Sequence, residues 1–226
     1  MRHVGDLTLN KIGIVTGLQR EAECFRSNYV VCAGANSNKA YELSTKLAVN
    51  GCTALISFGI AGGLAPNLKP GAVVIGKKVL GKENSGIETD ISMRQKLAEI
   101  IPDSLVGSIY SSPRAVADVS EKAAIFSKYN ALAADMESLA IGVAATENHL
   151  PFSIVRIVAD PASQQLPNFA FNAIDPNGNA RIGPVMVGLI KNPIEIANLV
   201  RLGRNSNKAF RQLRRVALLI GSEFGF

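Results

Sequence analysis

The feature of this sequence that most restricts its fold is a regular alternation of short apolar runs with stretches of helical periodicity. The runs at residues 11–16 (KIGIVT), 54–58 (ALISF) and 152–159 (FSIVRIVA) are typical of buried strands. Between them lie amphipathic segments such as 39–50 (KAYELSTKLAVN), which stops at Gly51. Strands that alternate with helices predict an α/β fold with a mixed, mostly parallel sheet flanked by helices.

Length and composition predict a single globular domain spanning residues 1–226. Hydrophobic residues make up 47% of the chain and charged residues 19%, a composition that excludes disorder as the main state. No apolar run approaches the roughly 18 residues that a bilayer span needs. Because residues 1–13 hold no apolar stretch of the kind found in signal peptides, we expect a cytoplasmic protein.

The cysteine and histidine counts argue against disulfides and metals. The three cysteines, Cys24, Cys32 and Cys52, are an odd number and no two have C-x-x-C spacing. The two histidines are too few for a His-rich site. We therefore expect neither a disulfide framework nor a metal, and no cofactor.

The positive charge is concentrated in the last part of the chain. The net charge is +6, of which residues 188–226 carry +5. This tail has no Tyr or Trp, so nucleic acid is not expected as a partner. Within the basic helical tail, residues 207–222 (NKAFRQLRRVALLIGS) place apolar side chains at helical spacing among arginines. The segment either lies on an anionic membrane surface, at the inner membrane face, or closes the core and exposes its arginines.

Four groups of unusual residues follow the predicted strands. The first is the glycine-rich segment 57–64 (SFGIAGGL), expected to be a turn whose free N–H groups cradle an anion at Gly59 and beyond, or else a plain tight connection. It is not a G-x-G-x-x-G motif and no helix clearly follows it, which disfavours a dinucleotide site.

The second and third groups bring carboxylates to strand ends. Glu137 follows Asp135 at a strand-to-helix junction, where Asp135 could simply be an N-cap. Arg156 and Asp160 share one face of a strand, and Arg156 needs a buried carboxylate partner, for which Glu137 is the candidate. The alternative is a structural ion pair and a turn aspartate.

The fourth group, Gly17, Arg20 and Glu21, follows the first predicted strand, where Glu21 could also be an ordinary exposed helical charge. Because the carboxyl ends of parallel strands meet at one edge of a sheet, we expect all four groups to converge. Three carboxylates and an anion cradle without metal ligands suit a reaction that develops charge without a cofactor.

Three segments in this order and spacing resemble the superfamily of purine nucleoside phosphorylases and methylthioadenosine/S-adenosylhomocysteine nucleosidases. They are 59–76 (GIAGGLAPNLKPGAVVIG), 133–145 (AADMESLAIGVAA) and 155–162 (VRIVADPA). The DMESLA element, the loop beginning DPASQQLPN and a C-terminal L-x-x-x-P are similar to the hopanoid-associated phosphorylase group, which is assigned to removal of adenine from the lipid adenosylhopane.

The resemblance implies a homo-oligomeric enzyme that acts on a lipid-linked adenine nucleoside in hopanoid biosynthesis. The alternatives are a methylthioadenosine/S-adenosylhomocysteine nucleosidase and a non-catalytic module that binds a nucleoside or amphiphile. The short segment 25–34 argues against a methylthioadenosine/S-adenosylhomocysteine nucleosidase, because it leaves little room for the β-hairpin usual in those enzymes.

The resemblance also implies roles for single residues. Asp160 matches the acid that protonates N7 of the leaving purine, Glu137 the carboxylate that binds the ribose hydroxyls, and Met136 the residue that packs on the sugar. Val116 and Ala117 match residues that contact the base. Arg156 would hold Glu137 in place.

The nucleophile is the part of the predicted site that stays open. Glu21 and the backbone at Gly59 match groups near the nucleophile, whereas Ile60 departs from the serine that many relatives have there. The Glu21 carboxylate favours water, because it would repel a phosphate dianion. Arg20, Gly17 and the glycine N–H groups favour inorganic phosphate as co-substrate. The family name tips the expectation slightly toward phosphorolysis.

Overall fold

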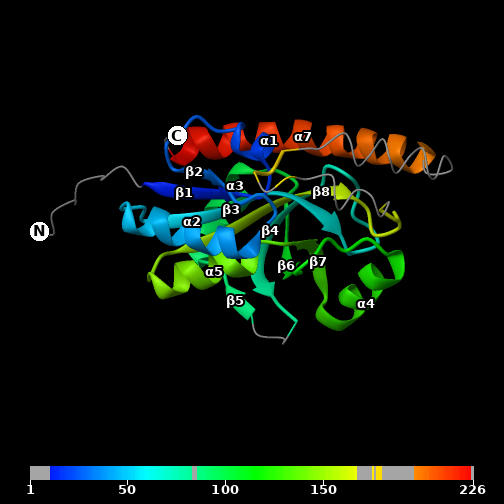
Figure 1. The fold of residues 1–226 in the computed structure, drawn as a ribbon, viewed down its shortest axis with the longest axis horizontal. Helices are drawn as coiled ribbons and strands as arrows, with labels where there is room; N and C mark the ends of the chain where they lie inside the picture. Colours follow the sequence, from blue (N-terminus) through cyan, green and yellow to red (C-terminus); the bar gives the residue numbers. More distant parts are fainter. Residues whose placement is uncertain (1–10, 83–85, 167–174, 176, 180–195, 225–226) are drawn as a thin grey trace, which may run out of the picture.

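The computed structural model describes residues 11–82, 86–166, 175, 177–179 and 196–224. It confirms the predicted α/β fold, a mixed sheet with helices on both faces (Figure 1). The strands are β1 (Ile12–Thr16), β2 (Val30–Cys32), β3 (Ala54–Gly63), β4 (Val73–Leu80), β5 (Gly86–Glu88), β6 (Leu105–Ser111), β7 (Ala131–Asp135) and β8 (Phe152–Asp160). The helices are α1 (Gln19–Ala22), α2 (Ser37–Val49), α3 (Ile91–Ile100), α4 (Val119–Tyr129), α5 (Ser138–Glu147) and α7 (Ile196–Phe224).

The sheet closes on itself around β8. Its order is β2-β1-β3-β7-β6-β4-β5, and β8 pairs with both β3 and β4. Strands β3, β7, β6, β4 and β8 therefore form a ring, with β1, β2 and β5 attached outside it. Among the pairings in the described part of the chain, β1–β2, β1–β3, β3–β8, β4–β6 and β6–β7 are parallel, and three others are antiparallel.

The ring brings the ends of β3, β7 and β8 together. Because β3 and β8 are parallel, Gly62 lies opposite Asp160 at their carboxyl ends. Gly62 also pairs with Ala134, the residue before Asp135 at the end of β7. Two acidic side chains far apart in sequence thus reach the same end of the ring.

The glycine-rich segment is a strand rather than the expected turn. Strand β3 continues to Gly63, since residues 59–62 pair with β8 and residues 62–63 pair with β7. A segment that has partners on both sides keeps its extended conformation even where glycines lower its intrinsic strand preference. The glycines instead provide space for neighbouring side chains, as described for the site below.

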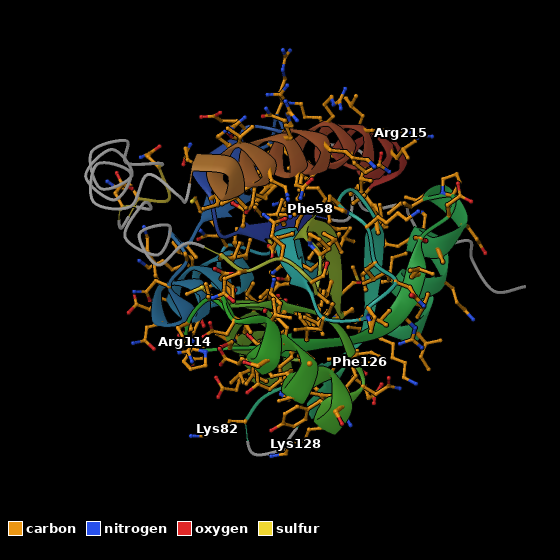
Figure 2. The ribbon with its side chains drawn as sticks, turned by 90° about the vertical axis from the view of Figure 1, so that its right-hand side faces the viewer. Phe58, Lys82, Arg114, Phe126, Lys128 and Arg215 are labelled. Atoms are coloured by element: carbon orange, nitrogen blue, oxygen red, sulfur yellow. The ribbon has the colours of Figure 1, made fainter. Side chains whose placement is uncertain are left out.

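Two apolar layers cover the faces of the sheet. On one face α2 and α5 pack around Leu55 and Ile154, and on the other α3 and α7 pack around Ile56 and Phe58. Figure 2 shows α7 crossing above the strands, with Phe58 beneath it and Arg215 on its outer side.

Helix α7 contains the segment 207–222 and closes the core. Its buried side chains are Ala209, Phe210, Leu213, Val216, Ala217 and Ile220. Arg211, Arg214 and Arg215 are exposed on the opposite side. The apolar face expected to meet either a membrane or the core is therefore occupied by the sheet. Residues 188–195 of the expected basic tail lie outside the described residues.

No helix in the described ranges is both long enough and apolar enough to cross a bilayer.

The packing of α7 predicts that its inner face stabilises the whole domain. Leu213→Ala, at a fully buried position, should lower the free energy of unfolding by about 2–5 kcal/mol, because it leaves a cavity. Leu218→Ala on the same helix is a matched control, since Leu218 is 72% exposed, and should change it by less than about 0.5 kcal/mol. Urea unfolding of the two variants measures both values, and equal losses would contradict the assigned packing.

Candidate active site

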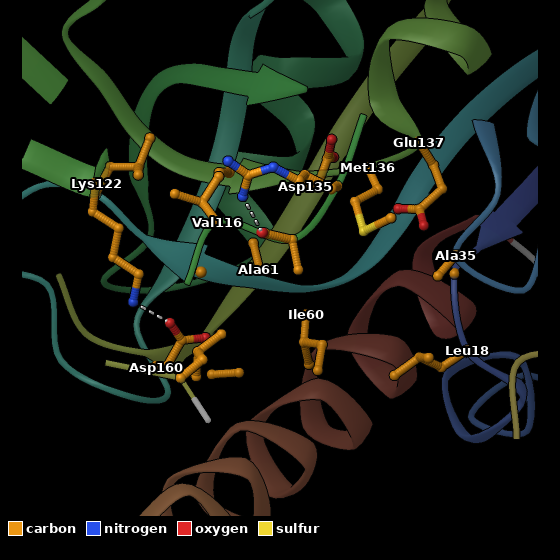
Figure 3. A pocket seen from close by; sticks show the side chains of 18 of the residues that line it. Leu18, Ala35, Ile60, Ala61, Val116, Lys122, Asp135, Met136, Glu137 and Asp160 are labelled. Atoms are coloured by element: carbon orange, nitrogen blue, oxygen red, sulfur yellow. Dashed lines mark hydrogen bonds and ion pairs between the residues drawn. The ribbon is translucent and has the colours of Figure 1, made fainter. Parts of the chain in front are cut away.

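A cavity of about 160 Å³ opens where β3, β7 and β8 end. The residues around it come from the β1–α1 turn, the end of β3, the segment before α4, the β7–α5 junction and the end of β8. Of the residues predicted from sequence, Gly17, Glu21, Ile60, Val116, Met136, Glu137 and Asp160 line it. In Figure 3 Glu137 and Met136 lie on one side of the cavity, and Asp160 lies on the other.

Glu21 is buried and held by backbone donors. Its carboxylate accepts hydrogen bonds from the backbone N–H groups of Gly17 and Leu18, both at 2.9 Å, and of Ile60 at 2.8 Å. Burial raises the pKa of Glu21, and the backbone donors and Arg156 only partly oppose this. A Cβ at Gly59 would lie 2.7 Å from both carboxylate oxygens, so glycine is required there for Glu21 to fit.

The N–H group expected to cradle an anion is therefore already used within the protein. Ile60 donates to Glu21, and no turn follows Gly59. Arg20, the other expected phosphate ligand, is exposed and stacks 4.3 Å from the centre of the Phe210 ring on α7. It does not line the cavity, whereas Gly17 does.

Arg156 lies at the centre of a buried polar network. Its Nε donates to Asp135 Oδ2 at 2.7 Å, and its Nη2 donates to Ser57 Oγ at 2.6 Å and to Ser138 Oγ at 3.1 Å. The Glu137 carboxylate is farther from Nη2, at 3.9 Å. The closest carboxylate partner of Arg156 is thus Asp135, while the predicted partner Glu137 is the more distant one.

Asp135 is not the N-cap that the sequence allowed for, because the N-cap of α5 is Glu137, but its side chain still bonds to the start of the helix. It accepts hydrogen bonds from the backbone N–H and the hydroxyl of Ser138 in the first turn of α5, and it pairs with Arg156. Nη1 of Arg156 is buried without a hydrogen-bond partner among the described residues. A buried donor of this kind carries a desolvation penalty that a ligand or water can relieve.

Glu137 shares this network but faces the cavity. Burial raises its pKa to about 8, and the neighbouring Asp135 adds to the rise while Arg156 opposes it. A Cβ at Gly17 would lie 2.9 Å from Glu137 Oε1, so a second glycine makes room for a second carboxylate. The pKa of about 8 therefore favours the protonated form of this side chain near neutral pH.

Asp160 has a partner that the sequence analysis missed. Its Oδ2 lies 2.5 Å from Nζ of Lys122, a side chain from α4 with no exposed surface (Figure 3). Burial raises the pKa of Asp160, and Lys122 opposes the rise. One sequence signal was present: Lys122 precedes Ile125 by three residues, which puts a lysine on the apolar face of the helix.

The two predicted base contacts differ in position. Val116 lines the cavity, opposite the Glu137 side in Figure 3. Ala117 is buried and its carbonyl accepts a hydrogen bond of 3.1 Å from the backbone N–H of Leu166, but it does not line the cavity.

Three buried carboxyl groups whose pKa values are raised by burial lie around one cavity, and groups of this kind are candidates for holding and transferring protons. Among the described residues, no group of three or more His, Cys, Asp or Glu side chains is arranged to hold a metal ion.

Comparisons with known proteins identify the family and the fold of the chain. Residues 26–190 match the family model described as the phosphorylase superfamily. The fold is similar to that of the Helicobacter pylori 5'-methylthioadenosine/S-adenosylhomocysteine nucleosidase, with a TM-score of 0.64 at 14% identity over 92% of this chain and 97% of that one.

Two further solved structures have the same fold. The Streptococcus pyogenes S-adenosylhomocysteine nucleosidase has a TM-score of 0.66 at 18% identity over 95% of this chain and 98% of that one. The Helicobacter pylori futalosine hydrolase has a TM-score of 0.60 at 16% identity over 68% of this chain and 88% of that one. No curated protein matches the chain.

The raised pKa of Glu137 predicts that this side chain destabilises the protein at alkaline pH. Folding raises its pKa from 4.5 to about 8, so its contribution to stability is present below pH 4.5 and is lost as the pH rises to about 8. Glu137→Gln should therefore unfold at a higher temperature than the native protein at about pH 9, by at least about 2–4 °C, and at about the same temperature near pH 4.5.

Thermal unfolding at the two pH values checks this prediction. Glu99→Gln, at an exposed position on α3, is the control and should behave like the native protein at both. A Glu137→Gln variant that is less stable at alkaline pH would contradict the burial of an unfavourable charge.

Proposed function

The chain belongs to the phosphorylase superfamily, and on that premise we propose that it releases adenine from an adenine nucleoside by cleaving the N-glycosidic bond. The observation that carries the proposal is the placement of Asp160 and Glu137 on opposite sides of one cavity. A nucleoside has a basic ring at one end and the hydroxyl groups of its ribose at the other. Asp160 can donate a proton to the ring, and Glu137 can accept hydrogen bonds from the hydroxyl groups.

Asp160 is proposed as the general acid. Breaking the bond between C1′ and the base leaves negative charge on the base, and a proton on N7 neutralises it. Burial raises the pKa of Asp160, which favours the protonated form that a general acid needs where the base departs. General acid assistance of this kind typically accelerates a reaction about 10²–10⁴-fold.

Glu137 is proposed to bind the 2′ and 3′ hydroxyls of the ribose. Burial raises the pKa of its carboxyl group to about 8, which favours the protonated form near neutral pH. Hydroxyl donors and the positive charge that develops on C1′ and the ring oxygen both favour its ionised form. The interaction therefore strengthens as the bond breaks, which is the property that lowers a barrier.

Water is the nucleophile that the geometry favours. Glu21 already receives the Ile60 N–H, and Arg20 stacks on Phe210 instead of facing the cavity. A phosphate dianion beside Glu21 would thus meet a carboxyl group, whereas the raised pKa of Glu21 suits it to accept a proton from water. We therefore propose hydrolysis ahead of the phosphorolysis that the sequence slightly favoured.

A second cavity beside the first leads us to propose that the substrate carries an apolar 5′ substituent. This second cavity, of about 620 Å³, shares Ile60, Met136 and Asp160 with the first and reaches Leu202 and Ser206 on α7. Its lining is mostly apolar, which suits a hydrocarbon group. Together with the resemblance of the DMESLA element, this supports adenosylhopane ahead of methylthioadenosine as substrate.

The same helix offers a route to a lipid substrate. Leu202 lines the cavity, and Arg211, Arg214 and Arg215 are exposed farther along α7. Since the apolar face of α7 is packed against the sheet, any contact with an anionic membrane would be electrostatic and would weaken with salt.

The substrate prediction is tested by adenine release. The protein is incubated with adenosylhopane and with methylthioadenosine, each with and without inorganic phosphate, and free adenine is followed. We expect adenine from adenosylhopane at the same rate with and without phosphate, because the cavity holds a base for water. A strict need for phosphate would establish phosphorolysis instead, and release from methylthioadenosine alone would favour the smaller substrate. Tight adenine binding without any turnover would favour a non-catalytic module.

The general-acid role predicts the effect of Asp160→Asn. The variant should fold, because asparagine has nearly the same shape, and its kcat should fall by about 10²–10⁴-fold. Asp90→Asn is the matched control: Asp90 caps α3 by accepting from the Met93 N–H, and asparagine caps equally well. An Asp160→Asn variant with close to the native rate would exclude the assigned role.

A further inference from the structure

The Lys122 side chain is a buried cation that the proposed reaction has not yet used. Its ammonium group lies 2.5 Å from Asp160 Oδ2, 2.8 Å from the carbonyl oxygen of Gln164 and 3.2 Å from that of Pro161. An ammonium group has three N–H donors, and here three acceptors surround it. The geometry thus matches the charged form of lysine, with every proton directed at a fixed oxygen.

The arrangement also fixes the carboxyl group of Asp160. Lys122 occupies Oδ2, and in the described part of the chain no donor contacts Oδ1. A Cβ at Gly62 would lie 3.4 Å from Oδ2, so β3 leaves just enough room for this orientation. Asp160 lines both cavities, which leaves Oδ1 as the oxygen able to face a ligand.

The other charged groups near Asp160 have different partners. Arg114 lines the same cavities, but its Nη2 pairs at 2.9 Å with Glu121, and its side chain is 65% exposed. Arg156 pairs with Asp135. The remaining carboxyl groups, Glu21 and Glu137, belong to α1 and the β7–α5 junction, respectively. Among the described residues, Lys122 is therefore the cation in direct contact with Asp160.

Resting on the proposed function, we propose that Lys122 is a positioning residue for the general acid. Lys122 holds Oδ2 of Asp160 so that Oδ1 delivers its proton to N7. Once the proton has left, Lys122 stabilises the carboxylate of Asp160. The proton moves from Oδ1 to N7, and the electron pair of the C1′–N9 bond moves onto the base. Lys122 keeps all its protons throughout. Water attacks C1′ and gives one proton to Glu21, which then releases it to solvent, and solvent returns a proton to Asp160.

The physical reason lies in two opposing requirements on Asp160. Burial favours the protonated form of Asp160, so the proton is available for transfer but is also released less readily. A fixed positive charge beside Oδ2 stabilises the product of the transfer in the low-dielectric site. Burial without Lys122 would give an acid that is protonated over a wider pH range and transfers its proton more slowly.

The test compares the pH–rate profiles of the native protein, Lys122→Met and Lys122→Arg, using the adenine nucleoside that the native protein cleaves. Lys128→Met is the control, because Lys128 is exposed on the same helix and lies over the Tyr129 ring. For Lys122→Met we expect at least about a tenfold loss of kcat and an alkaline limb that moves up by about one pH unit or more. For Lys122→Arg the alkaline limb of the pH–rate profile should stay near its native position. For Lys128→Met both kcat and the alkaline limb should be unchanged.

A uniform loss of rate with an unmoved alkaline limb would mean that Lys122 is merely structural, and an unchanged rate would also overturn the inference. A second measurement does not depend on turnover. Carboxyl ¹³C NMR of aspartate-labelled protein, with the Asp160 signal identified by its absence in Asp160→Asn, follows the titration of Asp160 directly. A higher pKa in Lys122→Met supports the pairing even if no nucleoside is cleaved, and an unshifted titration refutes it. Absence of adenine release by the native protein would refute only the proposed function.

Discussion

The burial of acidic side chains at one end of a closed sheet is the constraint on which the rest of this structure depends. A carboxyl group removed from water needs donors within the protein or keeps its proton. The chain supplies different donors to each acid: backbone N–H groups to Glu21, Arg156 to Asp135, and Lys122 to Asp160. Three neighbouring acids thus have different partners within one small site, which is what separate chemical roles require.

Much of the fold could be predicted from the sequence because its strands are buried on both faces and stand out as apolar runs. The positions of Glu21, Glu137 and Asp160 also followed, since carboxyl ends of parallel strands converge. The extension of β3 through Gly63 could not be foreseen, because it depends on pairing with β8 and β7, which lie far away in sequence. Lys122 was missed for a similar reason, as its acceptor lies on another element.

Two glycines explain how the acids approach so closely. At Gly17 and Gly59 a methyl group would overlap the carboxylates of Glu137 and Glu21, respectively. Both glycines drew attention in the sequence as ligands of an anion supplied by a substrate. In the structure they make space for acids that belong to the protein itself. The same residue pattern therefore fits two sources of negative charge, a bound anion or the protein's own carboxyl groups, and only the three-dimensional arrangement distinguishes them.

The pairing of β8 along both of its edges has a mechanical consequence. Asp160 ends a strand that is hydrogen-bonded to β3 on one side and to β4 on the other, so its backbone has little freedom to swing. The wall opposite is different, because Leu202 and Ser206 belong to a helix that only packs against the sheet. Any adjustment of the second cavity would therefore come from the packing of α7 on the sheet, while the hydrogen bonds along both edges of β8 keep Asp160 in place.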